Sequence, residues 1–342
     1  MPPRSGYLPR RGSDGVWTEA GVEPDIGGVQ RETGPGGVLA PVREEADPRV
    51  GVVMITHNRR EEALRSVGRL LALPERPRVV VVDNGSSDGT ATAVAAAYPA
   101  VELIASPTNL GAVGRNLGVE RLDTPYVAFC DDDTWWDAGS LRRAADQLDR
   151  HPDIAVLTAR ILVEPGGRED PIVPELRDSP VPGRPGLPGP ALGSFLAGAS
   201  VLRREAFRAV GGFSPKLWLG GEEELLAVDL ATAGWELCYL ESLTVHHEAS
   251  RLRDPTRRRR DGLRNTLWFV WLRRPVRPAL RRTLHLVRTV PRDKTSVLAF
   301  GDAVRGAGWV LTHRRRVPPR VEARLASLDR SQRESTARRY VG

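Results

Sequence analysis

The sequence predicts an α/β fold built on a doubly wound, mainly parallel sheet. Two observations predict it: short, continuously apolar runs alternate with segments of helical periodicity, and only a few residues connect one to the next. A strand that is apolar at every position is typical of a sheet covered by helices on both faces. Strands that alternate with helices in this way form parallel βαβ units. The length of 342 residues suggests about two domains.

The alternating pattern begins at residue 49, and the apolar run VGVVMIT (50–56) is its first strand. The next segment, 60–73, has its alanines, leucines and valine at helical spacing, which predicts a helix. The elements that follow are predicted in the same way, as strands at 78–85, 101–106 and 126–130 and helices at 88–98 and near 112–122.

A proline-rich segment interrupts the pattern after a further strand at 154–162. Eight prolines lie between Pro165 and Pro190, and these exclude a regular helix or a central strand. We therefore expect a long loop at 164–192, a candidate lid. Beyond it the sequence predicts a strand and a helix in GSFLAGASVLRREAF (193–207), a helix at 220–234 that ends at Gly234, and a strand pair or bent strand at 235–247.

The two ends of the chain differ in composition from its middle. Residues 1–48 are rich in glycine, proline and charge without a hydrophobic period, so we expect a disordered arm. Residues 251–342 are predicted to form basic amphipathic helices. The formal charge is +10 over 251–282 and +8 over 283–342, which leaves −11 for the first 250 residues. An acidic body with a basic tail argues against a specific nucleic-acid binder and indicates a separate part that meets an anionic surface.

The cysteine content and the apolar runs bear on the cellular compartment of the protein. Only Cys130 and Cys238 occur, both within apolar runs, so a disulfide framework is not expected and a reducing cytoplasm is the simpler expectation. No run reaches the roughly 18 apolar residues that a membrane span needs. No basic-then-apolar signal peptide is evident at the N-terminus.

Acidic residues gather where predicted strands end. The strand in YVAFCDDDTWWD (126–137) runs directly into Asp131, Asp132 and Asp133, and Asp83 ends an earlier strand. Sheets of this class bind ligands beyond the carboxyl ends of their strands. Three adjacent carboxylates repel one another, so they need either water, as in a solvated acidic turn, or a cation. Carboxylate oxygens are hard ligands that suit Mg²⁺ or Mn²⁺.

Four stretches together resemble the nucleotide-sugar half of family 2 glycosyltransferases, the inverting class with the GT-A fold. These are THN (56–58), VDNGSSDGT (82–90), NLGAVGRNLG (109–118) and FCDDDTWW (129–136). The resemblance lies in their order, their spacing and their places after buried strands. It implies a GT-A domain at 49–250, with a nucleotide-sugar half at 49–137 and an acceptor half at 138–250.

The resemblance implies roles for the acids. Asp131 and Asp133 look like the family's DxD motif, which holds Mg²⁺ or Mn²⁺ and through it the diphosphate, while Asp132 would lie nearer the sugar and ribose. Asp83 resembles the residue that accepts a hydrogen bond from the nucleotide base. A carboxylate suits the imide N–H of uracil or thymine, which favours UDP or dTDP; an Asx turn is the alternative.

Further binding residues follow from the same resemblance. Thr56 and Asn58 would line the same edge of the sheet. Arg115 resembles the family's basic or polar contact near the diphosphate or sugar, with an ordinary surface arginine as the alternative. VHHEAS (245–250) resembles the histidine that completes the metal or diphosphate shell. Strand alternation lets only one of His246 and His247 face the site, and we expect His246; two histidines on an exposed strand end are the alternative.

The catalytic base is expected in GGEEELL, at the start of the helix at 220–234. Inverting transfer needs a carboxylate that takes the proton from the acceptor hydroxyl. Matching to the family puts Glu223 at that position. The family more often has aspartate there, so Glu222 and Glu224 remain rivals, and acids also favour any helix N-terminus.

The sequence therefore predicts a cytoplasmic, metal-dependent inverting glycosyltransferase. It would move a sugar from a nucleotide diphosphate to a hydroxyl on a glycan, a lipid-linked carrier or a small molecule. The alternative from another class is an inactive transferase-like module that binds membrane or nucleic acid through its basic tail. A nucleotidyltransferase would need a glycine-rich, lysine-containing phosphate loop near the first strand, and THNRREE (56–62) is not one.

The basic tail contains one strongly apolar piece, NTLWFVWLRRP (265–275). Trp268 and Trp271 beside arginines suit a helix that lies in the lipid interface, which would make the protein peripheral on the inner face of the cell membrane. Two alternatives stay open: the aromatic residues pack on the transferase domain, or the basic tail pairs electrostatically with the acidic body.

Overall fold

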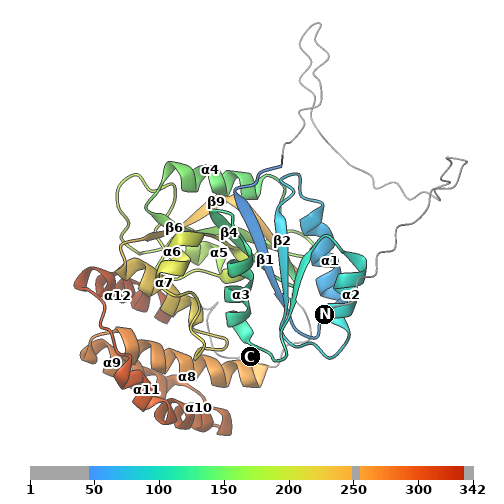
Figure 1. Ribbon diagram of the computed structural model, residues 1–342. Coiled ribbons are helices and arrows are strands. Elements are labelled where there is room, and N and C mark those ends of the chain that lie inside the picture. Colours follow the sequence, from blue (N-terminus) through green and yellow to red (C-terminus); the bar gives the residue numbers. More distant parts are fainter. Residues whose placement is uncertain (1–45, 249–254, 335–342) are drawn as a thin grey trace, which may run out of the picture. The chain divides into compact units, whose positions relative to one another are not determined.

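The computed structural model describes residues 46–248 and 255–334, and these residues form one compact unit (Figure 1). Almost all of the arm predicted at 1–48 lies outside the described residues. The strands are β1 (Val50–Thr56), β2 (Arg78–Asp83), β3 (Glu102–Ala105), β4 (Tyr126–Asp131), β5 (Thr134–Trp136), β6 (Ile154–Val163), β7 (Arg168–Glu169), β8 (Ser200–Arg203) and β9 (Glu236–His247).

The α-helices alternate with these strands and then continue alone. They are α1 (Arg60–Leu71), α2 (Thr90–Ala97), α3 (Gly114–Arg121), α4 (Ser140–Arg150), α5 (Val173–Arg177), α6 (Arg204–Ala209), α7 (Glu222–Thr232), α8 (Pro255–Arg273), α9 (Val276–Thr289), α10 (Lys294–Arg305), α11 (Ala307–Thr312) and α12 (Pro319–Glu334). Where the sequence predicts the bounds of a single strand or helix, the observed bounds differ by at most two residues. In the segment 193–207, β8 begins only at Ser200 and ends before α6. Helix α4 was not predicted, although its buried face repeats at helical spacing.

The first half of the sheet is parallel, as predicted. Strands β3, β2, β1 and β4 lie side by side in that order, and all three pairings are parallel. In this register Thr56 pairs with Asp83, and Ile55 pairs with Asp131. The carboxyl ends of β1, β2 and β4 therefore bring the predicted site residues to one edge of the sheet. The prediction of a doubly wound α/β fold is confirmed.

The second half of the sheet is mixed. Strand β8 is antiparallel to β4 and to β6, β9 is parallel to β6, and β5 is antiparallel to β9. Strand β9 is one long strand with a register shift opposite Ala159 and Arg160, which answers the question left open between a strand pair and a bent strand.

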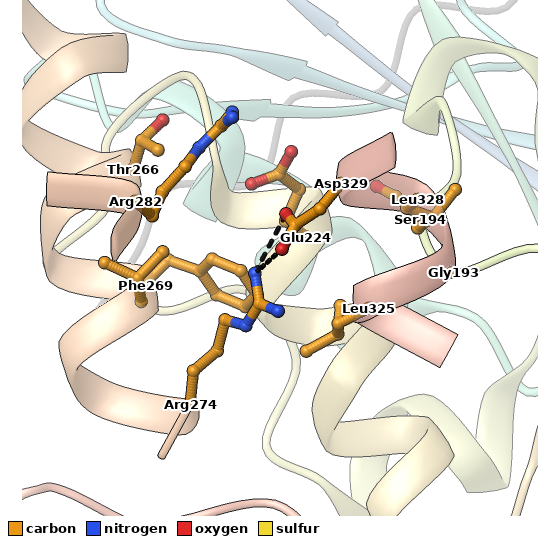
Figure 2. A pocket seen from close by; sticks show the side chains of 11 residues that line it. Gly193, Ser194, Glu224, Thr266, Phe269, Arg274, Arg282, Leu325, Leu328 and Asp329 are labelled. Atoms are coloured by element: carbon orange, nitrogen blue, oxygen red, sulfur yellow. Dashed lines mark hydrogen bonds and ion pairs between the residues drawn. The ribbon is translucent and has the colours of Figure 1, made fainter. Parts of the chain in front are cut away.

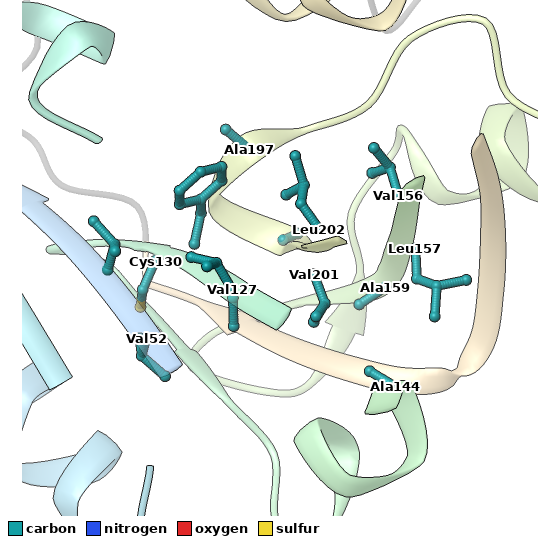
Figure 3. Packing of buried hydrophobic residues seen from close by; sticks show 14 of the residues in the cluster. Val52, Val127, Cys130, Ala144, Val156, Leu157, Ala159, Ala197, Val201 and Leu202 are labelled. Atoms are coloured by element: carbon teal, nitrogen blue, oxygen red, sulfur yellow. The ribbon is translucent and has the colours of Figure 1, made fainter. Parts of the chain in front are cut away.

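Branched aliphatic side chains fill the core on both sides of the sheet. The central strands are buried at nearly every position, and both cysteines are buried as thiols without a disulfide. Figure 3 shows Val52, Val127, Val201 and Leu202 of neighbouring strands meeting in this cluster. Tight packing fixes where the strand ends lie, since protein interiors do not deform continuously.

Helix α3 needs a glycine to approach β1. A Cβ atom on Gly118 would lie 2.3 Å from a Cγ atom of Val53, far inside van der Waals contact. The same helix carries Arg115 one turn earlier, so this close approach also sets the depth at which the arginine enters the site. The glycine-rich stretch NLGAVGRNLG (109–118) thus lets α3 lie close against the sheet.

The proline-rich segment is largely a loop, as predicted, but part of it is regular. Strand β7 pairs with β6, and α5 forms a short helix. The end of the segment is tied to β9, because Tyr239 N donates to Pro190 O at 2.9 Å and Leu192 N donates to Leu237 O at 2.8 Å.

The C-terminal helices pack on α7 and continue the body of the molecule. Leu225 and Val228 of α7 share an apolar cluster with Phe269 and Val270 of α8. Arg273 donates to both carboxylate oxygens of Asp229 at 2.6 and 2.8 Å. The region is helical and basic as predicted, and part of its charge is paired with the acidic body.

The two tryptophans of the apolar piece point inward. Trp268 Nε1 donates to Ala303 O at 3.0 Å, and Trp271 Nε1 donates to Thr283 Oγ1 at 3.1 Å. Both rings pack against the cluster shared with α7. The expectation of a lipid-facing Trp268 and Trp271 is therefore corrected in favour of the packing alternative, because other helices cover the apolar face of α8. In the described residues, no helix is long and apolar enough to cross a bilayer.

The packing of α3 leads to a stability prediction. Gly118→Ala should lower the free energy of unfolding by roughly 1–3 kcal/mol, because the added methyl group overlaps Val53. This loss should exceed the gain of about 1 kcal/mol that alanine brings to a helix interior. The matched control is Gly301→Ala in α10, where nothing lies within 4 Å of the new methyl group and stability should rise. Urea unfolding measures both; a gain for both variants would contradict the account.

Candidate active site

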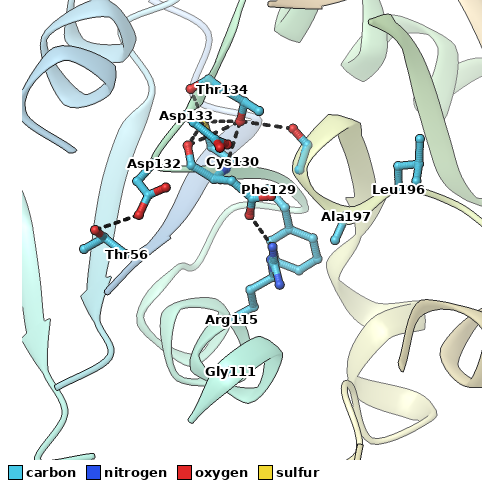
Figure 4. Close-up of polar contacts among 12 residues, drawn as sticks. Thr56, Gly111, Arg115, Phe129, Cys130, Asp132, Asp133, Thr134, Leu196 and Ala197 are labelled. Carbon is cyan, nitrogen blue, oxygen red and sulfur yellow. Dashed lines mark hydrogen bonds and ion pairs between the residues drawn. The ribbon is translucent and has the colours of Figure 1, made fainter. Parts of the chain in front are cut away.

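Two arginines and a threonine contact the three adjacent aspartates at the end of β4; Figure 4 shows Arg115 and Thr56 among these contacts. Asp132 accepts from Thr56 Oγ1 at 2.9 Å and from Arg59 Nη1 at 2.8 Å. The same Arg59 nitrogen lies 3.2 Å from Asp133 Oδ2. Arg115 Nη2 donates to Asp131 Oδ1. The protein's own cations therefore offset most of the repulsion within the acid triplet.

Burial separates the roles of these carboxylates. Asp132 is almost completely buried, and burial raises its pKa to about 7; the charge of Arg59 opposes this rise, and the neighbouring carboxylates add to it. Asp133 is equally buried. The Asp131 side chain is 39% exposed, so it is the member of the triplet that solvent or a ligand reaches most readily.

A glycine in a short turn makes room for Asp131. Gly198 lies in η2 (Ala197–Ala199), a 3-10 turn that precedes β8. A Cβ atom on Gly198 would be 2.7 Å from Asp131 Oδ2, so any side chain there would displace the carboxylate. The turn is also held to the end of β4, since Thr134 Oγ1 lies within 3.4 Å of Gly198 O and accepts from Asp131 N at 2.9 Å.

The same turn holds one of the three glutamates that begin α7. Ala197 N donates to Glu223 Oε1 at 2.5 Å. Glu223 and Asp131 thus flank one turn from two sides, although 92 positions separate them in the sequence. The structure brings the expected base and the expected metal-binding motif to one place.

The neighbouring glutamates have different surroundings. Glu222 is buried, and burial raises its pKa to about 8; the charge of Glu223 raises it further, whereas Arg115 lowers it. Glu224 instead lines a small cavity of about 30 Å³ (Figure 2). The other residues that line the cavity come mainly from the C-terminal helices, among them Phe269, Arg274, Arg282 and Leu325.

Asp83 has one oxygen in a turn and one without a partner. Its Oδ1 accepts from Ser86 N at 2.7 Å, which agrees with the Asx-turn alternative. Its Oδ2 is buried and has no hydrogen-bond partner among the described residues. A buried carboxylate oxygen without a donor is costly, so this atom is suited to a ligand that brings an N–H group.

Asn58 holds the loop after β2. It has a positive φ of 53°, its N donates to Ser86 Oγ at 2.8 Å, and its Oδ1 accepts from Ser87 N at 2.7 Å. These contacts shape the loop that follows Asp83. Thr56 and Asn58 therefore both lie at the expected edge, but each of their side chains is engaged by the protein itself.

The structure places His247, not His246, beside the acid triplet. His247 Nε2 lies 3.8 Å from Asp133 Oδ2. His246 Nδ1 lies 2.9 Å from Glu164 Oε1, and its ring stacks on Trp135. Register accounts for these positions, which differ from the one expected for His246: β5 and β9 pair Thr134 with His247 and Trp135 with His246. Strand alternation shows that one histidine faces the site, but it does not tell which one.

The sequence analysis missed two residues of the site. Arg59 follows THN directly, and the need of three acids for counter-charge could have pointed to it. Gly198 carries no local signal, because its function depends on a turn that meets β4 only in the folded chain.

The donor atoms suit a divalent cation, although they are not assembled around one. The carboxylates of Asp131 and Asp133 and the imidazole of His247 are ligands that Mg²⁺ or Mn²⁺ accepts. In the described ranges, no three histidine, cysteine, aspartate or glutamate side chains are grouped closely enough to hold a metal ion.

This chain is similar to known glycosyltransferases in sequence. Residues 51–211 match the family described as Glycosyl transferase family 2. The chain is 30% identical over 281 residues to an N-acetylglucosaminyl-diphospho-decaprenol L-rhamnosyltransferase of Mycobacterium tuberculosis, covering 69% of this chain and 90% of the relative. It is 31% identical over 217 residues to a pre-mycofactocin glycosyltransferase of the same organism, covering 60% of this chain and 44% of the relative.

Two solved structures are similar in fold. A mannosyltransferase from Pyrobaculum calidifontis in complex with GDP-Man and Mn²⁺ matches with a TM-score of 0.52 and 19% identity, covering 83% of this chain and 76% of that one. GalNAc-T7 with UDP, GalNAc and Mn²⁺ matches with a TM-score of 0.55 and 14% identity, covering 78% and 56%. The predicted resemblance is confirmed: this chain belongs to glycosyl transferase family 2 and is a glycosyltransferase with the GT-A fold.

Proposed function

We propose that this glycosyltransferase transfers a sugar from a nucleotide diphosphate to an acceptor hydroxyl, with inversion at the anomeric carbon and with a divalent metal. The observation that carries the proposal is the turn Ala197–Ala199, which Glu223 and Asp131 flank from two sides. Inverting transfer needs a base for the acceptor hydroxyl and a charged site for the leaving diphosphate, close together but separate. The two carboxylates meet that requirement.

The nucleotide end of the donor is assigned to the edge formed by β1 and β2. The unpartnered Oδ2 of Asp83 suits the imide N–H of uracil or thymine, which supports UDP or dTDP as the nucleotide. Asn58 keeps the loop after Asp83 in place. Thr56 orients the carboxylate of Asp132, the middle residue of the triplet, beside which the ribose or sugar would lie.

Asp131, Asp133 and His247 would hold Mg²⁺ or Mn²⁺, with His247 taking the role first expected of His246. When bound, such an ion stabilises the negative charge on the departing diphosphate. The names of two similar structures include Mn²⁺, which supports this assignment. Arg115 orients Asp131, and Arg59 orients Asp133, so that their oxygens stay at the end of β4.

Glu223 is the proposed base. The hydrogen bond from Ala197 N fixes one of its oxygens and thereby the orientation of the carboxylate. Glu222 is a weaker candidate, because it is buried and burial raises its pKa. Glu224 is weaker for another reason, since its side chain lines the cavity next to the C-terminal helices.

A lipid-linked carrier is the acceptor that we favour over a free glycan or a small molecule. The relative that is 30% identical is named for an acceptor carried on diphospho-decaprenol. We further propose that the enzyme acts in the cytoplasm and as a peripheral protein on the inner face of the cell membrane. The rival function, an inactive module that binds through its basic tail, offers no reason for the site to keep Asp131, Asp133 and Glu223.

The base assignment predicts a selective loss of transfer. Glu223→Gln should leave donor binding nearly intact and lower the transfer rate by roughly 10²–10⁴-fold, as expected for a lost general base. Calorimetry with nucleotide diphosphate measures binding, and single-turnover sugar transfer or donor hydrolysis measures rate. Glu224→Gln is the matched control and should stay close to wild type. An inactive Glu222→Gln beside an active Glu223→Gln would move the base to Glu222.

The metal assignment predicts loss of metal-dependent donor binding in Asp131→Asn. The change keeps the size of the side chain and removes the charge that an ion would meet, so Mn²⁺ should no longer strengthen UDP binding in calorimetry. Asp137→Asn, a change at an exposed acid a few residues away, should behave as wild type. Full turnover by the wild-type enzyme in excess EDTA would rule out the metal.

A further inference from the structure

Helix α9 carries an apolar stripe that the fold does not use. Val276, Leu280, Leu284 and Val287 recur every three or four residues, which places them on one face of the helix. They are 52%, 48%, 42% and 51% exposed. The residues that pack α9 onto the rest of the protein, Ala279 and Leu286, lie on another face. Exposed apolar side chains gathered in this way mark a contact site.

A row of arginines borders the stripe. They are Arg277, Arg281 and Arg288, and all three are exposed. Each directly follows a residue of the stripe in the sequence, so the three lie next to the apolar face of the helix. Within the part of the chain that the structure describes, none of the three makes an ion pair. The sequence from 275 to 292 contains neither aspartate nor glutamate.

Several other arginines of the C-terminal helices are paired with acids of this chain. Arg273 bonds to Asp229, Arg274 bonds to Glu322, and Arg259 bonds to Asp293. Where the C-terminal helices meet each other or the body, the chain supplies acids. Along the outward side of α9 it supplies none, which leaves these three charges to solvent or to a partner.

We propose that α9 docks this glycosyltransferase onto an anionic lipid bilayer. Val276, Leu280, Leu284 and Val287 would enter the interface, while the three arginines contact the headgroup phosphates. A bilayer offers an apolar interior and an anionic surface side by side, as the stripe and the row require. Nucleic acid offers the charge but no apolar phase for four aliphatic side chains.

The position of α9 fits this use. It contacts α8, and α8 packs on α7, whose first turn holds Glu223. A bilayer at α9 would bring the enzyme to the surface from which a lipid-linked acceptor is presented. The lipid-linked acceptor rests on the proposed function, whereas the docking of α9 does not, because docking needs no catalysis.

Vesicle sedimentation tests the proposal with the full chain. Wild type should pellet with phosphatidylcholine vesicles that contain about a third of phosphatidylglycerol, but not with pure phosphatidylcholine, and salt should release it by screening. Leu280→Gln/Leu284→Gln/Val287→Gln should lower binding at least tenfold. These positions are exposed, so circular dichroism and thermal unfolding should match wild type; the single variant Leu280→Gln provides a second, milder test.

A second variant tests the arginines of α9 and has a matched control. Arg277→Gln/Arg281→Gln/Arg288→Gln should lower vesicle affinity on the order of 10²-fold, since each arginine near an anionic surface contributes about fivefold. Arg65→Gln/Arg150→Gln/Arg168→Gln removes the same charge from exposed, unpaired arginines elsewhere and should bind almost as wild type. Metal-dependent donor hydrolysis should be unchanged in all of these variants, which separates this test from that of the proposed function.

Several results would overturn the proposal. Equal loss of binding in the two arginine variants would mean that net charge alone binds the vesicles. Unchanged binding in the stripe variant would remove the role of the apolar face. A dimer in lipid-free solution that the stripe variant abolishes would mean that a second copy covers α9, and tight binding of the wild type to RNA in place of vesicles would identify a different partner.

Discussion

Two arginines allow three consecutive aspartates to stand at the end of one buried strand. Without Arg59 and Arg115, the charges of Asp131, Asp132 and Asp133 would repel one another at short range in a poorly solvated place. Arg115 reaches Asp131 because Gly118 lets α3 lie close against β1. Arg59 reaches the other two because it ends the connection from β1 into α1, at the N-cap of that helix. The core packing of the first half of the chain thus determines the electrostatics of the site.

The second half of the sheet completes the site through a single turn. Strand β8 runs antiparallel to β4, so the residues just before β8 arrive at the end of β4. Gly198 meets Asp131 there, and Ala197 holds Glu223. Helix α7 is itself supported by α8 from the C-terminal region, which makes the basic tail part of the framework behind the catalytic carboxylate. The outward face of α9 is then left for a partner.

The sequence was sufficient where chemistry follows local pattern. Buried valine-rich runs predicted the parallel strands, and parallel strands bring Thr56, Asp83 and Asp131 to one edge whatever the rest of the chain does. The sequence was insufficient where strand register or a contact between distant segments determines which side chain faces the site or is buried. The pairing of β5 with β9 selects His247 over His246, and helical periodicity could not tell that other helices would cover Trp268 and Trp271. Glu223 was matched by resemblance; its anchor at Ala197 became visible only in the fold.

The charge balance in the acid triplet is tested most directly by Arg59→Met, studied at two pH values. Around pH 8.5 the variant should lose roughly 3 kcal/mol of folding stability, because buried carboxylates lose their counter-charge. Asp132, with a pKa raised to about 7, is protonated near pH 5 and then needs no arginine, so the loss should fall by half or more. Arg60→Met, at an exposed neighbouring arginine, is the control. The same loss at both pH values, or none at either, would contradict the account.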